Sequence, residues 1–265
     1  MGNKIVFAHL LVIALITYVL RMKLPESDAW QDKSETVQVI HKTSYLDLLQ
    51  PKFLKSILFL MGVYLVWNLA AGVMGFFMPY IYQQVGGVSA NMANILQMGL
   101  FIFTGLGVAF IFMPFADKYR KTVFGIAASM AVIGWSLFLL PAEGLPILVL
   151  FIVMIGINNG AGQQANYQLW ASEIFPTEYS ASAQGLMFFL VRISIGAWSL
   201  FVSMVITNMG IGFMAAILLG CVTVSMIIGL AFAPNTSGKS LEQIQEELYG
   251  TPPAQAEQGQ TRKIM

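Results

Sequence analysis

Long uninterrupted apolar runs are the feature that most limits what this chain can fold into. A helix needs roughly 20 residues to cross a hydrocarbon core about 30 Å thick, and seven runs approach or exceed that length, at 4–22, 54–82, 91–115, 122–140, 145–170, 184–208 and 211–233. The runs lack the alternation of barrel strands, so only helices can satisfy their backbone in lipid. We therefore predict an all-α integral membrane protein with seven transmembrane helices.

The composition excludes several classes of protein. The 265 residues are 57% hydrophobic and 10% charged, which leaves too little polar surface to coat a soluble globule. The net charge of +1 provides no electrostatic basis for binding nucleic acid, and the single Cys221 cannot form an intrachain disulfide. With two histidines and no nucleotide-binding or metal-binding motif, we expect no enzyme, no catalytic residue, no cofactor and no metal.

The basic residues predict the orientation in the membrane. Lys and Arg gather in the connection at 21–56, in the turn after Phe115 and in the C-terminal tail, whereas the loops at 86–91, 141–146 and 208–210 contain none. Short loops rich in Lys and Arg remain in the cytoplasm. The pattern predicts a multi-pass protein of the cell membrane whose N-terminus lies outside and whose C-terminus is cytoplasmic.

Amide side chains interrupt the fifth apolar run, at Asn158, Asn159, Gln163, Gln164 and Asn166. On a continuous helix, Asn159, Gln163 and Asn166 share one face, and an amide that faces lipid loses its hydrogen bonds at high cost. We therefore expect a water-filled cavity, because neutral amides suit a hydroxyl-rich, uncharged solute. The alternative is contact between helices, favoured by the GxxxG spacing of Gly156 and Gly160.

The expected depth of each residue in the bilayer adds residues from a second helix to the predicted substrate-binding site. The runs 54–82 and 145–170 cross in opposite directions, so Asn68 and Asn158 both fall near the midplane, where transporters bind substrate. Trp67 and Tyr167 offer flat apolar faces to a sugar ring. The predicted substrate-binding residues are Trp67, Asn68, Asn158, Asn159, Gln163, Gln164, Asn166 and Tyr167.

Ionisable side chains are scarce in the middle of the runs. All thirteen acids lie at run ends, in connections or in the tail, so no residue identifies the coupling ion of a symporter. His9 is interpreted as an ordinary polar side chain near the outer surface. Arg192, eight residues into the sixth run, either binds an anionic substrate or reaches the cytoplasmic edge to pair with Glu173 or a carbonyl. We favour the second interpretation.

Four short motifs carry a family resemblance. They are "LPESDAW" at 24–30, "FADKYRK" at 115–121, "EIFPTEYSASAQG" at 173–185 and "PNTSGKSLEQIQ" at 234–245. In this order and spacing they resemble the cytoplasmic motifs of a major facilitator superfamily transporter, most similar to the sugar porters and their polyol or inositol-carrying relatives. The resemblance covers nearly the whole chain and corresponds to spans six to twelve of the twelve in that family.

The resemblance implies an ion-pair network that closes the cytoplasmic face. Its residues by position would be the acids Glu26, Asp117 and Glu173 and the bases Lys118, Lys121 and Arg192. The chain departs from the pattern at Ser180, where the family has Arg, and at Arg120, which replaces a turn glycine. We expect the loss of a base beside Glu173 to weaken the closed inner gate or to shift its partner to Arg192.

The resemblance also implies the domain organisation. Residues 1–22 would form a span like family helix six, and 23–53 a cytoplasmic connection with short surface helices. Residues 54–233 would form the six-helix bundle of the C-terminal half, and 234–265 a partly disordered cytoplasmic tail.

The implied function is secondary active transport of a neutral sugar or polyol, inositol-like, by alternating access. The expected partners are the substrate, the lipid bilayer and an N-terminal half that supplies the opposite wall of the cavity. Two alternatives are a truncated fragment that transports nothing, and a transporter of an organic acid that binds Arg192.

Overall fold

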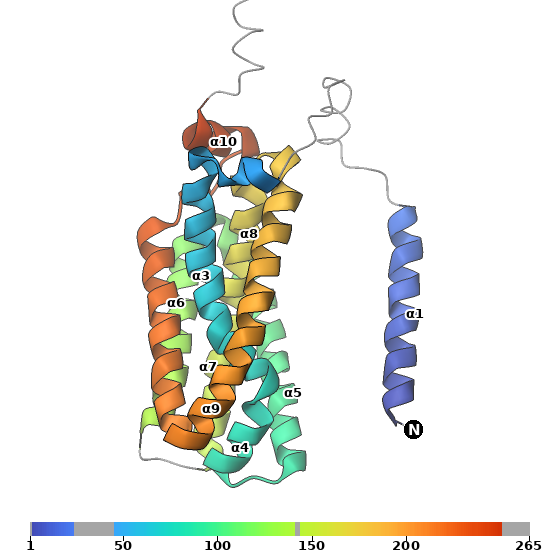
Figure 1. Cartoon of the computed structure of the whole chain (residues 1–265), viewed down its shortest axis with the longest axis vertical. Coiled ribbons are helices and arrows are strands. Elements are labelled where there is room, and N and C mark those ends of the chain that lie inside the picture. Colours follow the sequence, from blue (N-terminus) through green and yellow to red (C-terminus); the bar gives the residue numbers. More distant parts are fainter. Residues whose placement is uncertain (1, 24–44, 141–143, 251–265) are drawn as a thin grey trace, which may run out of the picture. The chain divides into compact units, whose positions relative to one another are not determined.

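The structure is a computed structural model that describes residues 2–23, 45–140 and 144–250. The chain divides into two units, Met1–Lys42 and Thr43–Met265. In the first unit, helix α1 (Gly2–Met22) exposes most of its apolar side chains between Ile5 and Met22. The described residues contain no β-strand, and the predicted all-α fold class is confirmed (Figure 1).

The second unit is a bundle of helices (Figure 1). They are α3 (Pro51–Phe76), α4 (Met78–Gly86), α5 (Ala90–Gly107), α6 (Met113–Ser136), α7 (Leu145–Ala161), α8 (Gln163–Ile174), α9 (Thr177–Phe232) and α10 (Leu241–Tyr249). A 3-10 turn (Tyr45–Leu49) precedes α3, a π-helical segment (Val108–Phe112) joins α5 to α6, and a second 3-10 turn (Leu137–Leu139) follows α6. Proline occupies the first turn of α3, α4, α6 and α7, where its missing N–H would have no intrahelical partner.

Four helical stretches of this unit are long and apolar enough to cross a membrane: Pro51–Phe76, Ala90–Leu139, Leu145–Ile174 and Thr177–Phe232. The second and fourth contain 50 and 56 residues, far more than one crossing requires. Each includes one residue with non-helical backbone angles, Tyr119 (φ −123°, ψ 38°) and Gly210 (φ 85°, ψ 170°). Each of the two therefore consists of two helices joined at a kink, and the count of seven spans stays a prediction.

Contacts at both ends of α9 show that this helix turns back at Gly210. Near its start, the Tyr179 ring packs against Phe53 of α3, with centroids 4.9 Å apart. Just beyond its end, Thr236 accepts a hydrogen bond from Arg120, whose ion-pair partner Glu173 lies shortly before α9 begins. Both ends of α9 therefore lie at the end of the bundle that carries α10, which we call the tail end. The positive φ of Gly210 is accessible to glycine without strain.

A close contact between backbones joins α5 to α7 through glycines. A Cβ on Gly160 would lie 2.2 Å from the Thr104 carbonyl oxygen, and a Cβ on Gly156 would lie 2.5 Å from Cβ of Phe103. The GxxxG spacing of Gly156 and Gly160 thus allows two backbones to meet, as small residues do between membrane helices.

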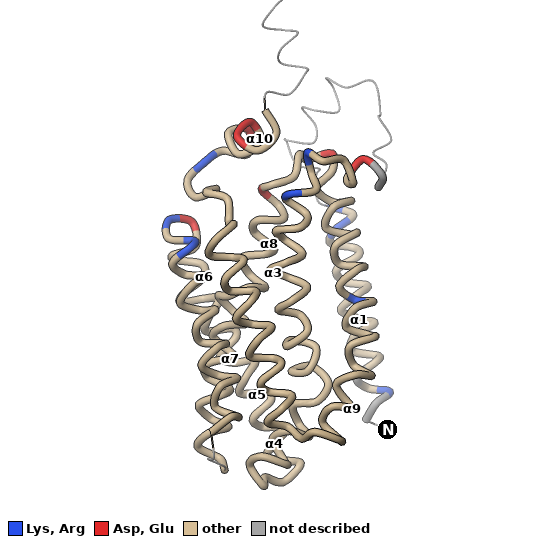
Figure 2. The backbone as a smooth tube through the Cα atoms, turned by 60° about the vertical axis from the view of Figure 1, so that its left-hand side comes forward, with Lys and Arg blue, Asp and Glu red and all other residues tan. Residues whose placement is uncertain are grey.

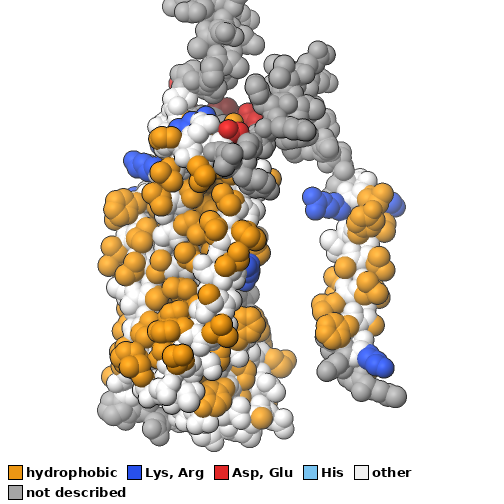
Figure 3. All heavy atoms as spheres, in the orientation of Figure 1, with side chains coloured by type: hydrophobic (Ala, Val, Ile, Leu, Met, Phe, Trp, Pro, Cys, Tyr) orange, Lys and Arg blue, Asp and Glu red, His pale blue; other side chains and the backbone are white. Residues whose placement is uncertain are grey.

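The surface of the bundle matches a lipid environment. The face shown in Figure 3 carries many apolar side chains. Large apolar side chains such as Phe110, Phe189 and Leu200 are 60–77% exposed. Most of the charged residues of the bundle gather at the tail end (Figure 2). Exposed apolar side chains on this scale are unfavourable in water and favourable against lipid.

The C-terminal segment packs on the tail end as far as Tyr249. Ser240 and Gln243 form a capping box that starts α10, and Ile244 of this helix is 2% exposed. The Tyr249 hydroxyl bonds to Ser56 at 3.0 Å, and its ring meets Phe53 edge-on at 5.1 Å. Burial raises the pKa of the Tyr249 phenol, so the neutral form is the one that docks. Residues 24–44 and 251–265, which contain most of the predicted connection and the predicted disordered tail, lie outside the described residues.

Candidate functional site

A break at Gly162 divides the amide-rich region between two helices. Gly162 has non-helical angles (φ −93°, ψ −133°), so α7 ends at Ala161 and α8 begins at Gln163. A Cβ at this position would lie 2.3 Å from Nδ2 of Asn158, which explains why glycine stands there. The shared helical face predicted for Asn159, Gln163 and Asn166 assumed one continuous helix, and the break at Gly162 contradicts that assumption.

Asn158 connects four helices at the centre of the bundle. Nε1 of Trp67 on α3 donates to its Oδ1 at 3.3 Å. Its Nδ2 donates to the Ala127 carbonyl of α6 at 2.9 Å and to Oε1 of Gln163 on α8 at 2.6 Å. Asn158 and Gln163 are fully buried, and Trp67 is 4% exposed. The contact places Trp67 and Asn158 at one depth, and buried hydrogen bonds of this kind rigidify a core.

Three other predicted binding residues also have partners inside the bundle. Nδ2 of Asn68 donates to the Tyr64 carbonyl at 2.8 Å. Nδ2 of Asn166 donates to the carbonyls of Ala161 at 2.9 Å and Gly162 at 2.8 Å, which satisfies the end of α7. The Tyr167 ring stacks on Tyr64 with centroids 3.7 Å apart. In this conformation these side chains hold helices together.

Several amide atoms around the break retain hydrogen-bonding capacity. Oδ1 of Asn159, Nε2 of Gln163 and Oδ1 of Asn166 are buried and have no partner among the described residues. Asn159 and Gln164 are half-buried, so they are the most open of the predicted amides. Buried polar atoms without partners are uncommon, and a ligand or water can satisfy them.

An ion pair lies at the tail end of the bundle. The Arg120 guanidinium contacts both oxygens of Glu173, at 2.5 Å and 3.1 Å, and also donates to the Thr236 hydroxyl. Arg120 is 5% exposed and Glu173 is 18% exposed. A bidentate arginine–carboxylate pair is strong and directional, and here it joins α6, α8 and the segment after α9.

The partner of Glu173 differs from the one expected. Arg192 contacts the face of Phe188, with the guanidinium 4.4 Å from the ring centroid, and Arg120 takes the place beside Glu173. Ser180, where the family has Arg, accepts a hydrogen bond from Gln184 at 3.0 Å. The base missing at position 180 is thus replaced from α6. The sequence contained one indication of this pairing: Arg120 is the only arginine in its turn, and a planar guanidinium can bind both oxygens of a carboxylate.

The other predicted gate residues have varied surroundings. Nζ of Lys118 lies 5.3 Å from the Tyr119 ring centroid, and Lys121 is exposed. The backbone carbonyl of Asp117 accepts a hydrogen bond from Ser237, which attaches the C-terminal segment to the turn of α6. Glu26 lies outside the described residues.

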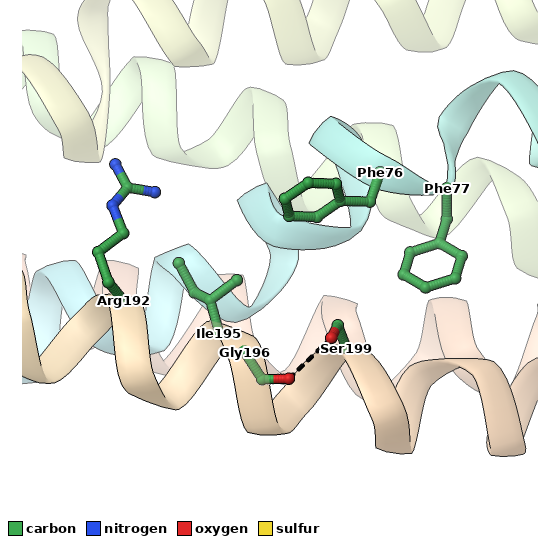
Figure 4. A pocket seen from close by; sticks show the side chains of 6 residues that line it. All are labelled: Phe76, Phe77, Arg192, Ile195, Gly196 and Ser199. Atoms are coloured by element: carbon green, nitrogen blue, oxygen red, sulfur yellow. Dashed lines mark hydrogen bonds between the residues drawn. The ribbon is translucent and has the colours of Figure 1, made fainter.

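A hollow of about 390 Å³ opens between α3 and α9. It is lined by Phe76, Phe77, Arg192, Ile195, Gly196 and Ser199 (Figure 4). The α3 helix ends there, at Phe76, and α4 begins two residues later at Met78 with Pro79 in its first turn. None of the residues predicted to bind substrate lines this hollow.

Comparison with known proteins identifies the class to which these features belong. The profile of the Major Facilitator Superfamily matches residues 2–199, and the chain belongs to this family of multi-pass membrane proteins. It is 82% identical to the minor myo-inositol transporter IolF of Bacillus subtilis (strain 168) over 272 residues, which cover 100% of this chain and 62% of that protein.

Two more distant relatives are similar over slightly less of the chain. One is the putative metabolite transport protein YaaU of Escherichia coli (strain K12), 27% identical over 86% of this chain and 56% of its own length. The other is the sugar transporter ERD6-like 7 of Arabidopsis thaliana, 28% identical over 81% of this chain and 48% of its own length. The chain therefore spans about half to three-fifths of the relatives that it matches.

Proposed function

We propose that this chain forms part of a secondary transporter that moves a neutral cyclic polyol of the myo-inositol type across the membrane. The observation that carries the proposal is the 82% identity to a myo-inositol transporter over the whole chain. The amide-rich centre supports it, since neutral amides both donate to and accept from hydroxyl groups. The activity is proposed for a whole transporter, because this chain spans 62% of that relative.

The bundle would contribute one wall of the transport path. Half-buried Asn159 and Gln164, together with the unpartnered atoms of Gln163 and Asn166, would bind substrate hydroxyls at the Gly162 break. The buried bonds of Asn158, Trp67 and Asn68 would hold that break in place. A second half would supply the opposite wall, and rocking of the two would expose the site to each side in turn.

The tail end would be the cytoplasmic end. Its Arg120–Glu173 pair would close the inner side of the path and separate when that side opens. The positive-inside pattern supports a cytoplasmic C-terminus and an outer N-terminus.

Uptake of radiolabelled myo-inositol tests the proposal. Cells that lack their own inositol uptake should express this chain together with the segment of the Bacillus relative that it does not match. Saturable uptake is expected, with little inhibition by an uncharged disaccharide that is too large for the site. If this chain is present in the membrane and the pair takes up no labelled polyol or hexose, the alternative of an inactive fragment replaces the proposal.

An organic acid is the second candidate substrate. The exposed guanidinium of Arg192 favours it, because a charged group within a membrane span commonly binds a charged ligand. Uptake of labelled glucuronate, compared with that of myo-inositol in the same cells, separates the two candidates.

A further inference from the structure

Arg192 lies near the middle of a membrane-spanning segment. It is fifteen residues beyond Thr177, where α9 begins, and eighteen before the reversal at Gly210. These separations correspond to about 22 Å and 27 Å along a helix. Three residues further on, Ile195 contacts the position of Gly72 in α3, so Arg192 lies at about the depth of Asn68. At this depth the Arg192 guanidinium is too far from the tail end to extend into the water there.

Because Arg192 lies at mid-depth, its exposure indicates whether this face of α9 is turned toward lipid or toward the transport path. Its side chain is exposed on the bundle, and its contact in the described residues is with the Phe188 ring. An arginine that faces lipid at mid-depth is strongly unfavourable, and such residues face water or protein instead. The face of α9 that carries Arg192 is thus turned toward the transport path.

The hollow beside Arg192, which we call the Arg192 pocket, follows this same face. Arg192, Gly196 and Ser199 recur at intervals of four and three residues, which aligns them along one side of α9 (Figure 4). Phe76 and Phe77 form the opposite wall from α3. Its volume of about 390 Å³ is large enough for a six-membered ring with its hydroxyl groups.

The polar groups of the Arg192 pocket suit hydroxyls. Arg192 supplies only donors. The Ser199 hydroxyl gives its hydrogen to the Gly196 carbonyl at 2.7 Å, so it presents lone pairs to the pocket. The faces of Phe76 and Phe77 carry negative partial charge, which disfavours an anion and favours the C–H face of a ring. Donors, an acceptor and aromatic faces together match a neutral polyol better than a carboxylate.

We propose that the Arg192 pocket binds the transported polyol, with Arg192 donating to its hydroxyl oxygens, Ser199 accepting from a hydroxyl and the two phenylalanines covering the ring. This inference rests on the proposed function for the class of ligand. It adds a site formed by α3 and α9, apart from the amides around Gly162, and it makes Arg192 a substrate contact in place of a gate residue.

Cysteine labelling tests the pocket without measuring transport. Gly196→Cys in a Cys221→Ala background places a thiol where a new Cβ meets no atom within 4 Å. The matched control is Gly220→Cys, in the second half of α9, whose Cβ also meets no atom within 4 Å and whose position is exposed. Both variants are made in membranes from cells that coexpress the segment described above, and are treated with a charged thiosulfonate reagent.

The pocket is expected to be wet and to bind polyol. Gly196→Cys should react with the charged reagent, and Gly220→Cys, in the half of α9 that carries no charged residue, should react at least ten times more slowly if it faces lipid. Myo-inositol should slow labelling of Gly196→Cys in a concentration-dependent way. Adding Arg192→Gln should raise the protecting concentration about tenfold or more, as expected for loss of a hydrogen bond from a charged donor. Arg192→Lys should restore part of the protection.

Each contrary result has a defined meaning. Equal or absent reaction of the two cysteines overturns the pocket as part of an aqueous path. Labelling of Gly196→Cys that myo-inositol does not slow, or that glucuronate slows instead, overturns a neutral-polyol site. Protection by myo-inositol without any uptake upholds the pocket and refutes transport, so the two proposals fail separately.

Discussion

At the scale of single residues, Arg120 contacts two residues that are far from it in the sequence. It joins Glu173, 53 residues away, and Thr236, 116 residues away. Arg120 is nearly buried, so its charge depends on those partners for compensation. The pair connects two helices and the C-terminal segment, which makes it a structural element of the tail end as well as the proposed inner gate.

Replacing Arg120 should therefore destabilise the bundle. We expect Arg120→Gln to lower the free energy of unfolding by about 3 kcal/mol, because Glu173 loses its compensating charge. Thermal unfolding in detergent measures the change. Lys121→Gln removes an exposed charge from the same turn and should change it by less than about 0.5 kcal/mol. Equal effects of the two substitutions would show that the ion pair contributes nothing specific.

The amide side chains around Gly162 show that residue type alone does not determine which polar atoms find hydrogen-bond partners. The composition of the fifth run required that these polar groups avoid lipid, and the structure is consistent with that requirement. The two amides differ in their hydrogen bonds. The side-chain polar atoms of Asn158 all have partners, whereas Nε2 of Gln163 has none among the described residues. Partners come from α3 and α6, so no local pattern in α7 could distinguish the two.

At the scale of elements, the contact between α5 and α7 depends on the absence of side chains. Gly160→Ala should destabilise the bundle by about 2 kcal/mol, since its Cβ would meet the Thr104 carbonyl at 2.2 Å and Val108 N at 2.8 Å. Gly105→Ala is the matched control on α5, because its Cβ would meet no atom within 4 Å. Denaturant or thermal unfolding of the two variants compares them, and a neutral Gly160→Ala would contradict the observed packing.

The docking of α10 belongs to the same scale. Tyr249→Ala removes the ring from Phe53 and the hydroxyl from Ser56, whereas Tyr249→Phe removes only the hydrogen bond. We expect Tyr249→Phe to weaken docking by about 1 kcal/mol and Tyr249→Ala to weaken it more. Limited trypsin digestion after Lys239, which precedes α10, reports release of the segment. Unchanged cleavage in Tyr249→Ala would show that the tail is not held by this side chain.

At the scale of the whole molecule, the orientation stays a prediction that accessibility can test. In a Cys221→Ala background, Asn91→Cys near the start of α5 should react with an impermeant thiol reagent added to intact cells. Glu246→Cys on α10 should react only after the membrane is opened. Both side chains are exposed, so their reactivity reports sidedness. The reverse result would invert the proposed orientation and place the Arg120–Glu173 pair at the outer face.

Sequence alone determined the features of this protein that arise from local physics. Apolar runs of membrane length must form helices, because their backbone groups find no partners in lipid. The order of four short motifs indicated the major facilitator superfamily, and the family profile confirms it. The close approach of helices at Gly156 and Gly160 was also visible as a spacing.

Only the tertiary structure decided the break at Gly162, the choice of Arg120 as partner of Glu173, and the pocket beside Arg192. Each depends on contacts between residues that are distant in sequence and belong to different helices. Hydrogen bonds and ion pairs form only over a few ångströms. The packing of the helices therefore decides which polar groups come close enough to pair, and the local sequence pattern does not determine that packing.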